Sequence, residues 1–280
     1  MSKYTIIYNS LSDNRKGETE AKELDALLKG HDLTYYDVQQ YDKQSIVAQL
    51  SDDDKLVIAG GDGTLNRFIN DTADMTLKNE VYFFPTGTGN DFLSSIGEEK
   101  GKLIPLNSYL GNLPTVTVNG KDYKFINGVG YGIDGYCCEV GDKMRETTDK
   151  PINYTSIAIK GLLFHFKPVN AKVTVDGKVH RFKKVWLAPT MFGRYYGGGM
   201  IPTPDQKRGD GAVSTMVYHN CGKLKALMIF PSIFKGEHVK HTDVVSIFKG
   251  HHVRVEFDKP TSLQIDGETI LGVTSYTVKI

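Results

Sequence analysis

Three glycines surround one aspartate in the segment GGDGTLN at residues 60–66. An apolar run at residues 56–59 precedes this segment and predicts a buried strand, while the apolar residues that follow recur at helical spacing. Such a turn brings backbone N–H groups close to phosphate oxygens, because glycine permits positive φ and a helix N-terminus carries unpaired donors. Asp62 beside a phosphate indicates Mg²⁺ binding or nucleotide positioning; the alternative is an ordinary Asp-Gly turn. We therefore predict a site for a nucleotide triphosphate.

A second glycine-rich segment, PTGTGNDF at residues 85–92, follows another apolar run at residues 81–84. It again predicts a strand, a tight turn and a helix, with Asn90 or Asp91 near the helix start. In a parallel sheet with helical crossovers, the loops after successive strands emerge at the same edge. Asp62 and Asp91 would then lie close enough to share a metal ion.

The order and spacing of these two segments resemble those of the diacylglycerol kinase catalytic family of bacterial lipid kinases, which also includes sphingosine and ceramide kinases. A first strand at residues 4–9 extends the resemblance, although Ser10 stands where the family usually has proline. The resemblance implies ATP and Mg²⁺ as cofactors. The residues that it assigns to the nucleotide site are Asn9, Ser10, Lys16, Gly60, Gly61, Asp62, Gly63, Thr64, Leu65, Asn66, Gly87, Thr88, Asn90 and Asp91.

The segment Asp266-Gly267-Glu268 matches the D-G-E segment of the same family, which carries the proposed general base. Glu268 is our preferred proton acceptor and Asp266 is the close alternative, with Asp62 as the third candidate catalytic residue. Spacing alone also permits a simpler interpretation, because an Asp-Gly pair between alternating apolar runs is typical of a two-residue hairpin turn.

A metal site is implied further along the chain. Residues 207–212, KRGDGA, fit a K-x-x-D-G-x pattern that holds a structural Mg²⁺ in related enzymes, partly through backbone carbonyls. The corresponding residues here are Lys207, Asp210 and Ala212. The alternative is an ordinary surface loop, since such loops commonly combine Lys, Asp and Gly.

The two halves of the chain differ in pattern. The first alternates apolar strands with helical segments such as residues 18–29, and the second has many strands at short spacing. We therefore predict an α/β nucleotide-binding kinase domain at residues 1–118, followed by a β-rich domain at 119–280 that completes the lipid and catalytic site. The resemblance implies a Rossmann-like first domain of the NAD kinase and phosphofructokinase type and an antiparallel β-sandwich second domain. The active site is expected in the cleft between them.

Composition favours a cytoplasmic enzyme. The 280 residues include 40% hydrophobic residues and lack an apolar run of about 18 residues, so no transmembrane segment is expected. The three cysteines and eight histidines show no metal-ligand or catalytic spacing. Residues 1–118 carry 11 Lys and Arg against 18 Asp and Glu, whereas residues 119–280 carry 23 against 15.

The basic second half favours contact with anionic lipid. Segments at residues 223–235 and 157–166 combine cations with bulky apolar residues, as a transient peripheral contact at the inner membrane surface would require; the alternative is a core helix with solvated lysines. Nucleic acid is not an expected partner, because no binding module is recognisable. A homodimer through an exposed sheet edge is left open.

The predicted function is transfer of the ATP γ-phosphoryl group to a lipid hydroxyl, most simply that of diacylglycerol or a related lipid alcohol. NAD kinases share the GGDG loop and are one alternative, although their second motif differs from PTGTGND. A nucleotide- or lipid-binding sensor without catalysis is the other. The sequence does not name the lipid acceptor.

Overall fold

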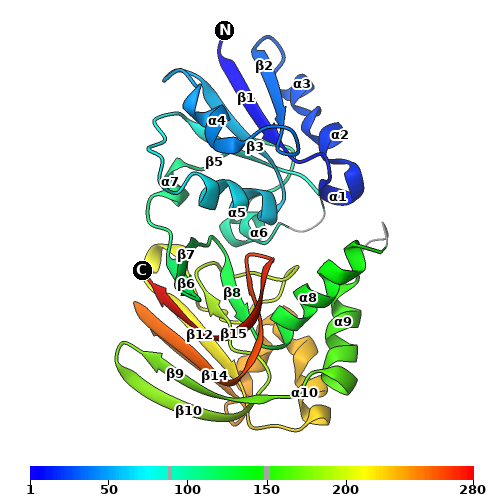
Figure 1. The fold of residues 1–280 in the computed structure, drawn as a ribbon, viewed down its shortest axis with the longest axis vertical. Coiled ribbons are helices and arrows are strands. Elements are labelled where there is room, and N and C mark those ends of the chain that lie inside the picture. Colours follow the sequence, from blue (N-terminus) through cyan, green and yellow to red (C-terminus); the bar gives the residue numbers. More distant parts are fainter. Residues whose placement is uncertain (88–89, 148–151) are drawn as a thin grey trace. The chain divides into compact units, whose positions relative to one another are not determined.

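The computed structural model describes residues 1–87, 90–147 and 152–280, so Thr88, one of the predicted nucleotide-binding residues, lies outside the described residues. The chain forms two compact units, residues 1–113 and 114–280 (Figure 1). The division falls before the predicted boundary at residue 118, because strand β6 (Thr115–Val118) pairs with β15 (Glu268–Lys279) of the second unit.

The first unit is an α/β domain around a five-stranded sheet with strand order β2-β1-β3-β4-β5. Strands β1 to β4 are parallel, and β5 runs antiparallel to β4. The strands are β1 (Lys3–Tyr8), β2 (Asp32–Asp37), β3 (Lys55–Gly60), β4 (Val81–Pro85) and β5 (Ile104–Pro105). The helices are α1 (Ser12–Arg15), α2 (Gly17–Ala21), α3 (Leu24–Leu27), α4 (Lys43–Ala48), α5 (Asp62–Asp71), α6 (Asp91–Ile96) and α7 (Asn107–Leu110).

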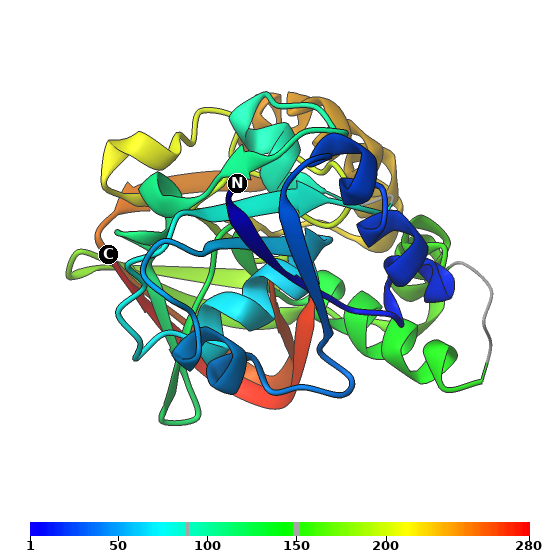
Figure 2. The ribbon, with the colours of Figure 1, turned by 90° about the horizontal axis from the view of Figure 1, so that it is seen from above.

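Both faces of this sheet are covered, which explains why its strands are apolar runs without alternation. On one face Ile6 and Val57 pack against Leu24 of α3. On the other face Ile58 and Phe68 of α5 are fully buried. The blue and cyan strands lie side by side in Figure 2, with the dark blue helices α1 to α3 at one side. The predicted helix over residues 18–29 forms as two short helices, α2 and α3.

The second unit is built on antiparallel strands, as predicted, with the order β13-β12-β11-β8-β14-β15-β6-β7 and with β9 and β10 attached through β14. Besides β6 and β15, its strands are β7 (Lys121–Lys124), β8 (Gly128–Tyr131), β9 (Val169–Val175), β10 (Lys178–Val185), β11 (Thr190–Met191), β12 (Val213–Tyr218), β13 (Val245–Gly250) and β14 (His252–Ile265). Its helices are α8 (Ile133–Arg145), α9 (Tyr154–Lys160) and α10 (Lys223–Ile229), with the shorter turns η1 (Gly161–His165), η2 (Arg208–Asp210), η3 (Phe230–Lys235) and η4 (Glu237–Lys240).

Helices α8, α9 and α10 cover one side of the second-unit strands (Figure 1). Their inner side chains, among them Ile133, Ile157 and Ile229, form one core with Trp186 and Met216. Trp186 is 1% exposed, and its indole N–H donates to the carbonyl of Cys221 at 3.0 Å. Among the described helices, none has the length and apolar character needed to cross a bilayer.

Candidate functional site

The two glycine-rich loops lie at the same edge of the first-unit sheet, as the sequence predicts. Strands β3 and β4 are parallel neighbours, and Gly60 at the end of β3 is paired with Pro85 at the end of β4. The Thr86 N–H continues this pairing by donating to the Gly60 carbonyl at 2.9 Å. Both loops therefore leave the sheet side by side at its carboxyl edge, where α/β proteins bind their ligands.

Asp62 joins the two loops directly. Its carboxylate accepts hydrogen bonds from the backbone N–H groups of Asp91 at 2.6 Å and of Phe92 at 3.1 Å. These N–H groups belong to the first turn of α6, where backbone N–H groups have no acceptor within the helix. Asp62 thus fixes the position of the second loop, a role that needs no metal ion. A metal shared with Asp91 remains a prediction.

The glycines of the two loops serve different purposes. None of the glycines Gly60, Gly61 and Gly63 has positive φ. The expectation that the first loop needs this conformation is therefore wrong. Gly60 is required for space instead, because a Cβ atom there would lie 2.5 Å from the Cβ atom of Thr64. Gly87 in the second loop does have positive φ, at 71°. A side chain is therefore excluded from the first loop by crowding and disfavoured in the second by backbone strain.

Two residues assigned to the nucleotide site also take part in the α5 packing. Leu65 is fully buried, and its N–H donates to the Gly61 carbonyl at 3.1 Å. Asn66 is 4% exposed, and its side-chain oxygen accepts from the Asn70 amide at 3.2 Å. Both side chains therefore pack within α5, and a nucleotide contact by either residue remains a prediction.

The N-terminal loop also reaches the second glycine-rich loop. Glu20 of α2 accepts a hydrogen bond from the Gly87 N–H at 3.1 Å. The Asn9 carbonyl accepts from the Ser12 N–H at 3.0 Å, and a Cβ atom at Gly17 would lie 1.9 Å from that carbonyl oxygen. Gly17 therefore permits the tight turn that returns the chain to this edge.

Ser10 and Lys16 lie within that N-terminal turn. The Ser10 N–H donates to Asp37 at 3.2 Å, so the residue that replaces the usual proline gains a hydrogen bond that proline could not make. Lys16 is exposed. Its contact with a phosphate remains a prediction.

Two buried polar atoms beside the second loop lack partners among the described residues, namely Thr86 Oγ1 and Asn90 Oδ1. A buried polar group without a hydrogen bond costs about 1–3 kcal/mol. The Asn90 side chain is otherwise held in place, because its amide donates to the Thr86 carbonyl at 3.1 Å. A polar ligand at this edge would satisfy both atoms, so these residues fit a nucleotide.

The D-G-E segment in the second unit forms a two-residue hairpin turn between β14 and β15, with φ of 46° at Asp266 and 96° at Gly267. The Asp266 carboxylate accepts the backbone N–H groups of Ile126, Asn127 and Gly128 at 2.6, 2.9 and 2.8 Å. It is 8% exposed and ties this turn to the start of β8. Asp266 therefore holds this turn in place, and the choice between Glu268 and Asp266 as the base remains a prediction.

Asp134 in the first turn of α8 is a further buried carboxyl group, which the sequence analysis did not predict. Its Oδ2 atom lies so close to Gly130 that a Cβ atom added there would collide with it. Gly130 is paired with Gln264 between β8 and β14. Gln264 in turn accepts the Gly267 N–H at 2.7 Å, so Asp134 and the D-G-E turn contact the same side chain. The available signal was an aspartate two residues after the glycine-rich segment at residues 128–132.

Burial raises the pKa of Asp134 to about 6, although the Gly135 N–H donates to it at 2.9 Å and opposes this shift. Its Oδ2 atom has no hydrogen-bond partner within the described ranges. A buried carboxyl group with a strongly raised pKa is a candidate functional residue. It can hold or release a proton under physiological conditions.

We expect Asp134→Asn to stabilise the protein at neutral pH. Because the folded-state pKa is raised, the folded protein binds this proton more tightly than the unfolded chain, and stability falls as pH rises from about 4 to about 6. The neutral variant avoids this loss, which amounts to at most about 3 kcal/mol. Urea unfolding at pH 4 and pH 7.5 measures it; the same pH dependence in both proteins would contradict the raised pKa.

The loop predicted to hold a structural Mg²⁺ is filled by a protein side chain. The carbonyls of Lys207 and Ala212 lie 3.1 and 2.9 Å from the amide nitrogen of Gln206, which is 3% exposed. The Asp210 carboxylate forms an ion pair with Lys249. An ion could bind only if Gln206 moved and Lys249 released Asp210, so the residues as arranged do not fit a metal ion. No group of three His, Cys, Asp or Glu side chains suited to a metal occurs in the described part of the chain.

Removing divalent cations should therefore leave the melting temperature of the ligand-free protein unchanged. The amide of Gln206 already satisfies the carbonyls that an ion would bind. Thermal unfolding in EDTA and in excess Mg²⁺ tests this expectation. Exchange into Ca²⁺-free buffer alone serves as the control. If it has no effect, a lower melting temperature in EDTA that added Mg²⁺ restores would show that a specific ion stabilises the fold.

Both units of the chain match models of known protein families. The model of the diacylglycerol kinase catalytic domain matches residues 3–112, and that of the YegS C-terminal NAD kinase beta sandwich-like domain matches residues 127–280. Diacylglycerol kinase of Bacillus subtilis is 24% identical over 229 residues, covering 79% of this chain and 73% of that protein. Diacylglycerol kinase of Mycobacterium tuberculosis is 26% identical over 211 residues, covering 72% and 67%. A diacylglycerol kinase structure from Bacillus anthracis shares the fold, with a TM-score of 0.65, 21% identity and 99% and 93% coverage.

Proposed function

Since this chain belongs to the diacylglycerol kinase family and is a lipid kinase, we propose that it transfers the γ-phosphoryl group of ATP to the hydroxyl of diacylglycerol or a related lipid alcohol. The observation that carries this proposal is the junction of two glycine-rich loops at one sheet edge by Asp62. That junction brings the backbone of both loops to one place, which supports the binding of a chain of phosphates.

The nucleotide is held by the first unit. Backbone N–H groups between Gly61 and Thr64 face the phosphates, while Thr86 and Asn90 supply polar atoms that lack protein partners among the described residues. Lys16 adds a positive charge. Mg²⁺ arrives with ATP as part of the substrate and neutralises phosphate charge. The protein contributes mainly positioning and electrostatic stabilisation, as in other phosphoryl transfers.

The acceptor hydroxyl is activated by the second unit. Glu268 accepts the hydroxyl proton as the lipid oxygen attacks the γ-phosphorus atom and the bond to ADP breaks. Asp266 holds the turn that carries Glu268, through its three backbone hydrogen bonds. Asp134, with its raised pKa, accepts or stores a proton close to the same turn. The reaction requires the bound nucleotide and the acceptor hydroxyl to be brought together.

Transfer of label from ATP radiolabelled on the γ-phosphate tests the proposal directly. The acceptors are short-chain diacylglycerol, monoacylglycerol, sphingosine and NAD, each dispersed without vesicles and with Mg²⁺. We expect label in one lipid and none in NAD. Label in NAD alone would assign the chain to NAD phosphorylation, and ATP binding without transfer to any acceptor would favour a sensor.

A further inference from the structure

Two helical segments of the second unit expose large apolar side chains next to each other. The Lys223 ammonium group of α10 donates to the Leu163 carbonyl of η1 at 2.8 Å, so the segments are in contact. Figure 1 shows α10 near the end of α9, which continues into η1. The exposed fractions are 41% for Ile159, 71% for Phe164, 76% for Leu224 and 75% for Met228, and we call these four residues the apolar face.

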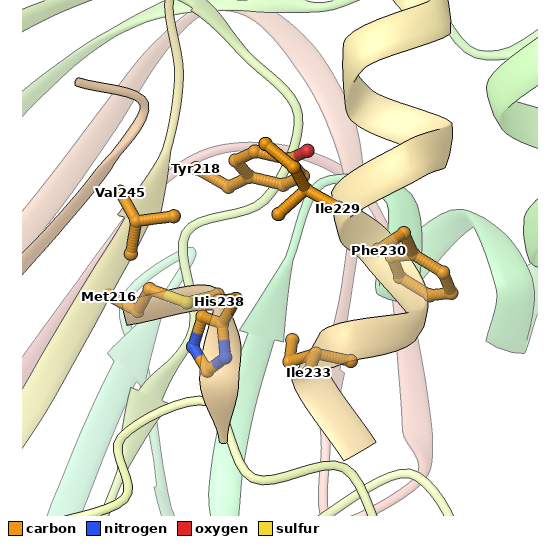
Figure 3. A pocket seen from close by; sticks show the side chains of 7 residues that line it. All are labelled: Met216, Tyr218, Ile229, Phe230, Ile233, His238 and Val245. Carbon is orange, nitrogen blue, oxygen red and sulfur yellow. The ribbon is translucent and has the colours of Figure 1, made fainter. Parts of the chain in front are cut away.

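The apolar face is not needed for the core, because the opposite sides of the same segments already supply it. Ala226 and Ile229 of α10 are buried in the second-unit core, while Leu224 and Met228, four residues apart, share the outer side of the helix. Beneath α10 lies a cavity of about 10 Å³, lined by residues that include Ile229, Phe230 and His238 (Figure 3). That volume is close to the limit for a single water and excludes an acyl chain. This cavity therefore has no room for lipid, whereas the outer side of α10 exposes apolar side chains that could contact it.

The charged side chains within the two segments are all basic. Residues 152–170 and 219–236, which contain the two segments, include five lysines and no aspartate or glutamate. Lys160, Lys167 and Lys235 are exposed. Lys225 is paired with Asp243 from outside the segments. Exposed apolar side chains in segments that also expose lysines match the interface of an anionic bilayer, where acyl carbon and phosphate lie at adjacent depths.

A second copy of the chain is a poorer partner for this surface. A two-fold contact would place the same lysines opposite one another, without an acidic residue in either segment to compensate. Like charges facing each other across an interface oppose association. Charge complementarity therefore selects a lipid surface over self-association.

We propose that the apolar face and its surrounding lysines dock the protein on an anionic lipid bilayer, with Phe164, Leu224 and Met228 entering the headgroup region. This proposal rests on the proposed function, since a lipid kinase must reach an acceptor that resides in a membrane. Docking here would hold the second unit, which carries Glu268, at the surface that supplies the acceptor.

Vesicle co-sedimentation without nucleotide tests the docking independently of catalysis. The vesicles contain phosphatidylcholine alone or phosphatidylcholine with phosphatidylglycerol, at low and at physiological salt. We compare the wild type with Leu224→Gln/Met228→Gln and with a control pair, Val179→Gln/Leu271→Gln, which alters side chains that are 51% and 58% exposed elsewhere in the second unit. All four positions are exposed, so each variant should fold.

The wild type and the control pair should bind anionic vesicles more strongly than neutral ones. The partition coefficient of Leu224→Gln/Met228→Gln should be lower by about tenfold or more, because two apolar side chains no longer enter the bilayer. Its transfer of phosphate to dispersed short-chain diacylglycerol should match that of the wild type. Equal vesicle binding by both variants, or equal binding to anionic and neutral vesicles, would overturn the docking proposal.

The outcomes separate this proposal from the proposed function. Vesicle binding without phosphoryl transfer to any acceptor would retain the docking surface and refute the kinase reaction. Phosphoryl transfer to dispersed lipid without vesicle binding would retain the kinase reaction and refute the docking surface. A dimer seen by sedimentation velocity that Leu224→Gln/Met228→Gln abolishes would assign the apolar face to a second copy instead of a bilayer.

Discussion

Replacing Glu268 by glutamine should lower kcat for phosphoryl transfer by about 10²- to 10⁴-fold, the usual contribution of a general base. Glutamine keeps the size of the side chain but cannot accept the hydroxyl proton. Glu268 is the first residue of β15 and is partly exposed, so its replacement should change the free energy of unfolding little. Steady-state kinetics on dispersed diacylglycerol and urea unfolding measure the two effects separately.

Two other acidic residues of the second unit provide controls for Glu268→Gln. Glu256→Gln makes the same chemical change at a surface ion pair with Lys172 and should retain full turnover. Asp266→Asn removes an acceptor for one of three backbone N–H groups and should lower the free energy of unfolding by about 3 kcal/mol. Wild-type turnover in Glu268→Gln, together with lost turnover in a still-folded Asp266→Asn protein, would reverse the two assignments.

Asp62→Asn should lower kcat at least about 100-fold, since small displacements of phosphate-positioning groups have effects of this size. The asparagine amide has one acceptor oxygen for two backbone N–H groups, those of Asp91 and Phe92. One of them loses its partner, and the second glycine-rich loop moves relative to the first. The free energy of unfolding should fall by about 1–3 kcal/mol, which the variant can tolerate.

The matched control is Asp71→Asn at the other end of the same helix. Asp71 pairs with Lys43 on the surface, and its side chain is 46% exposed, so the substitution should cost less than about 1 kcal/mol and leave kcat unchanged. Turnover and ATP affinity are measured for both variants. An Asp62→Asn protein with the wild-type rate would refute the positioning role, whereas equal losses in both variants would point to general damage to α5.

The sequence determined the class of fold and the position of the two glycine-rich loops at one edge of the first-unit sheet. Continuous apolar runs ahead of GGDG and PTGTG specify strands buried on both faces, and β3 and β4 are such strands in the structure. The short alternating strands of the second half specify an antiparallel β domain, which the structure confirms. These features depend on neighbours along the chain, so periodicity and turn residues suffice to predict them.

Only the tertiary structure decided what the individual carboxyl groups do. Asp266 and Asp62 both precede a glycine in sequence, yet each binds backbone N–H groups that are many residues away. Asp134 is the third case, since its raised pKa comes from burial beneath strands that the sequence cannot assemble. Likewise, Gln206 occupies the loop assigned to a metal, and α10 divides between core and surface. A side chain's role depends on long-range hydrogen bonds and desolvation, which exist only after the chain has folded.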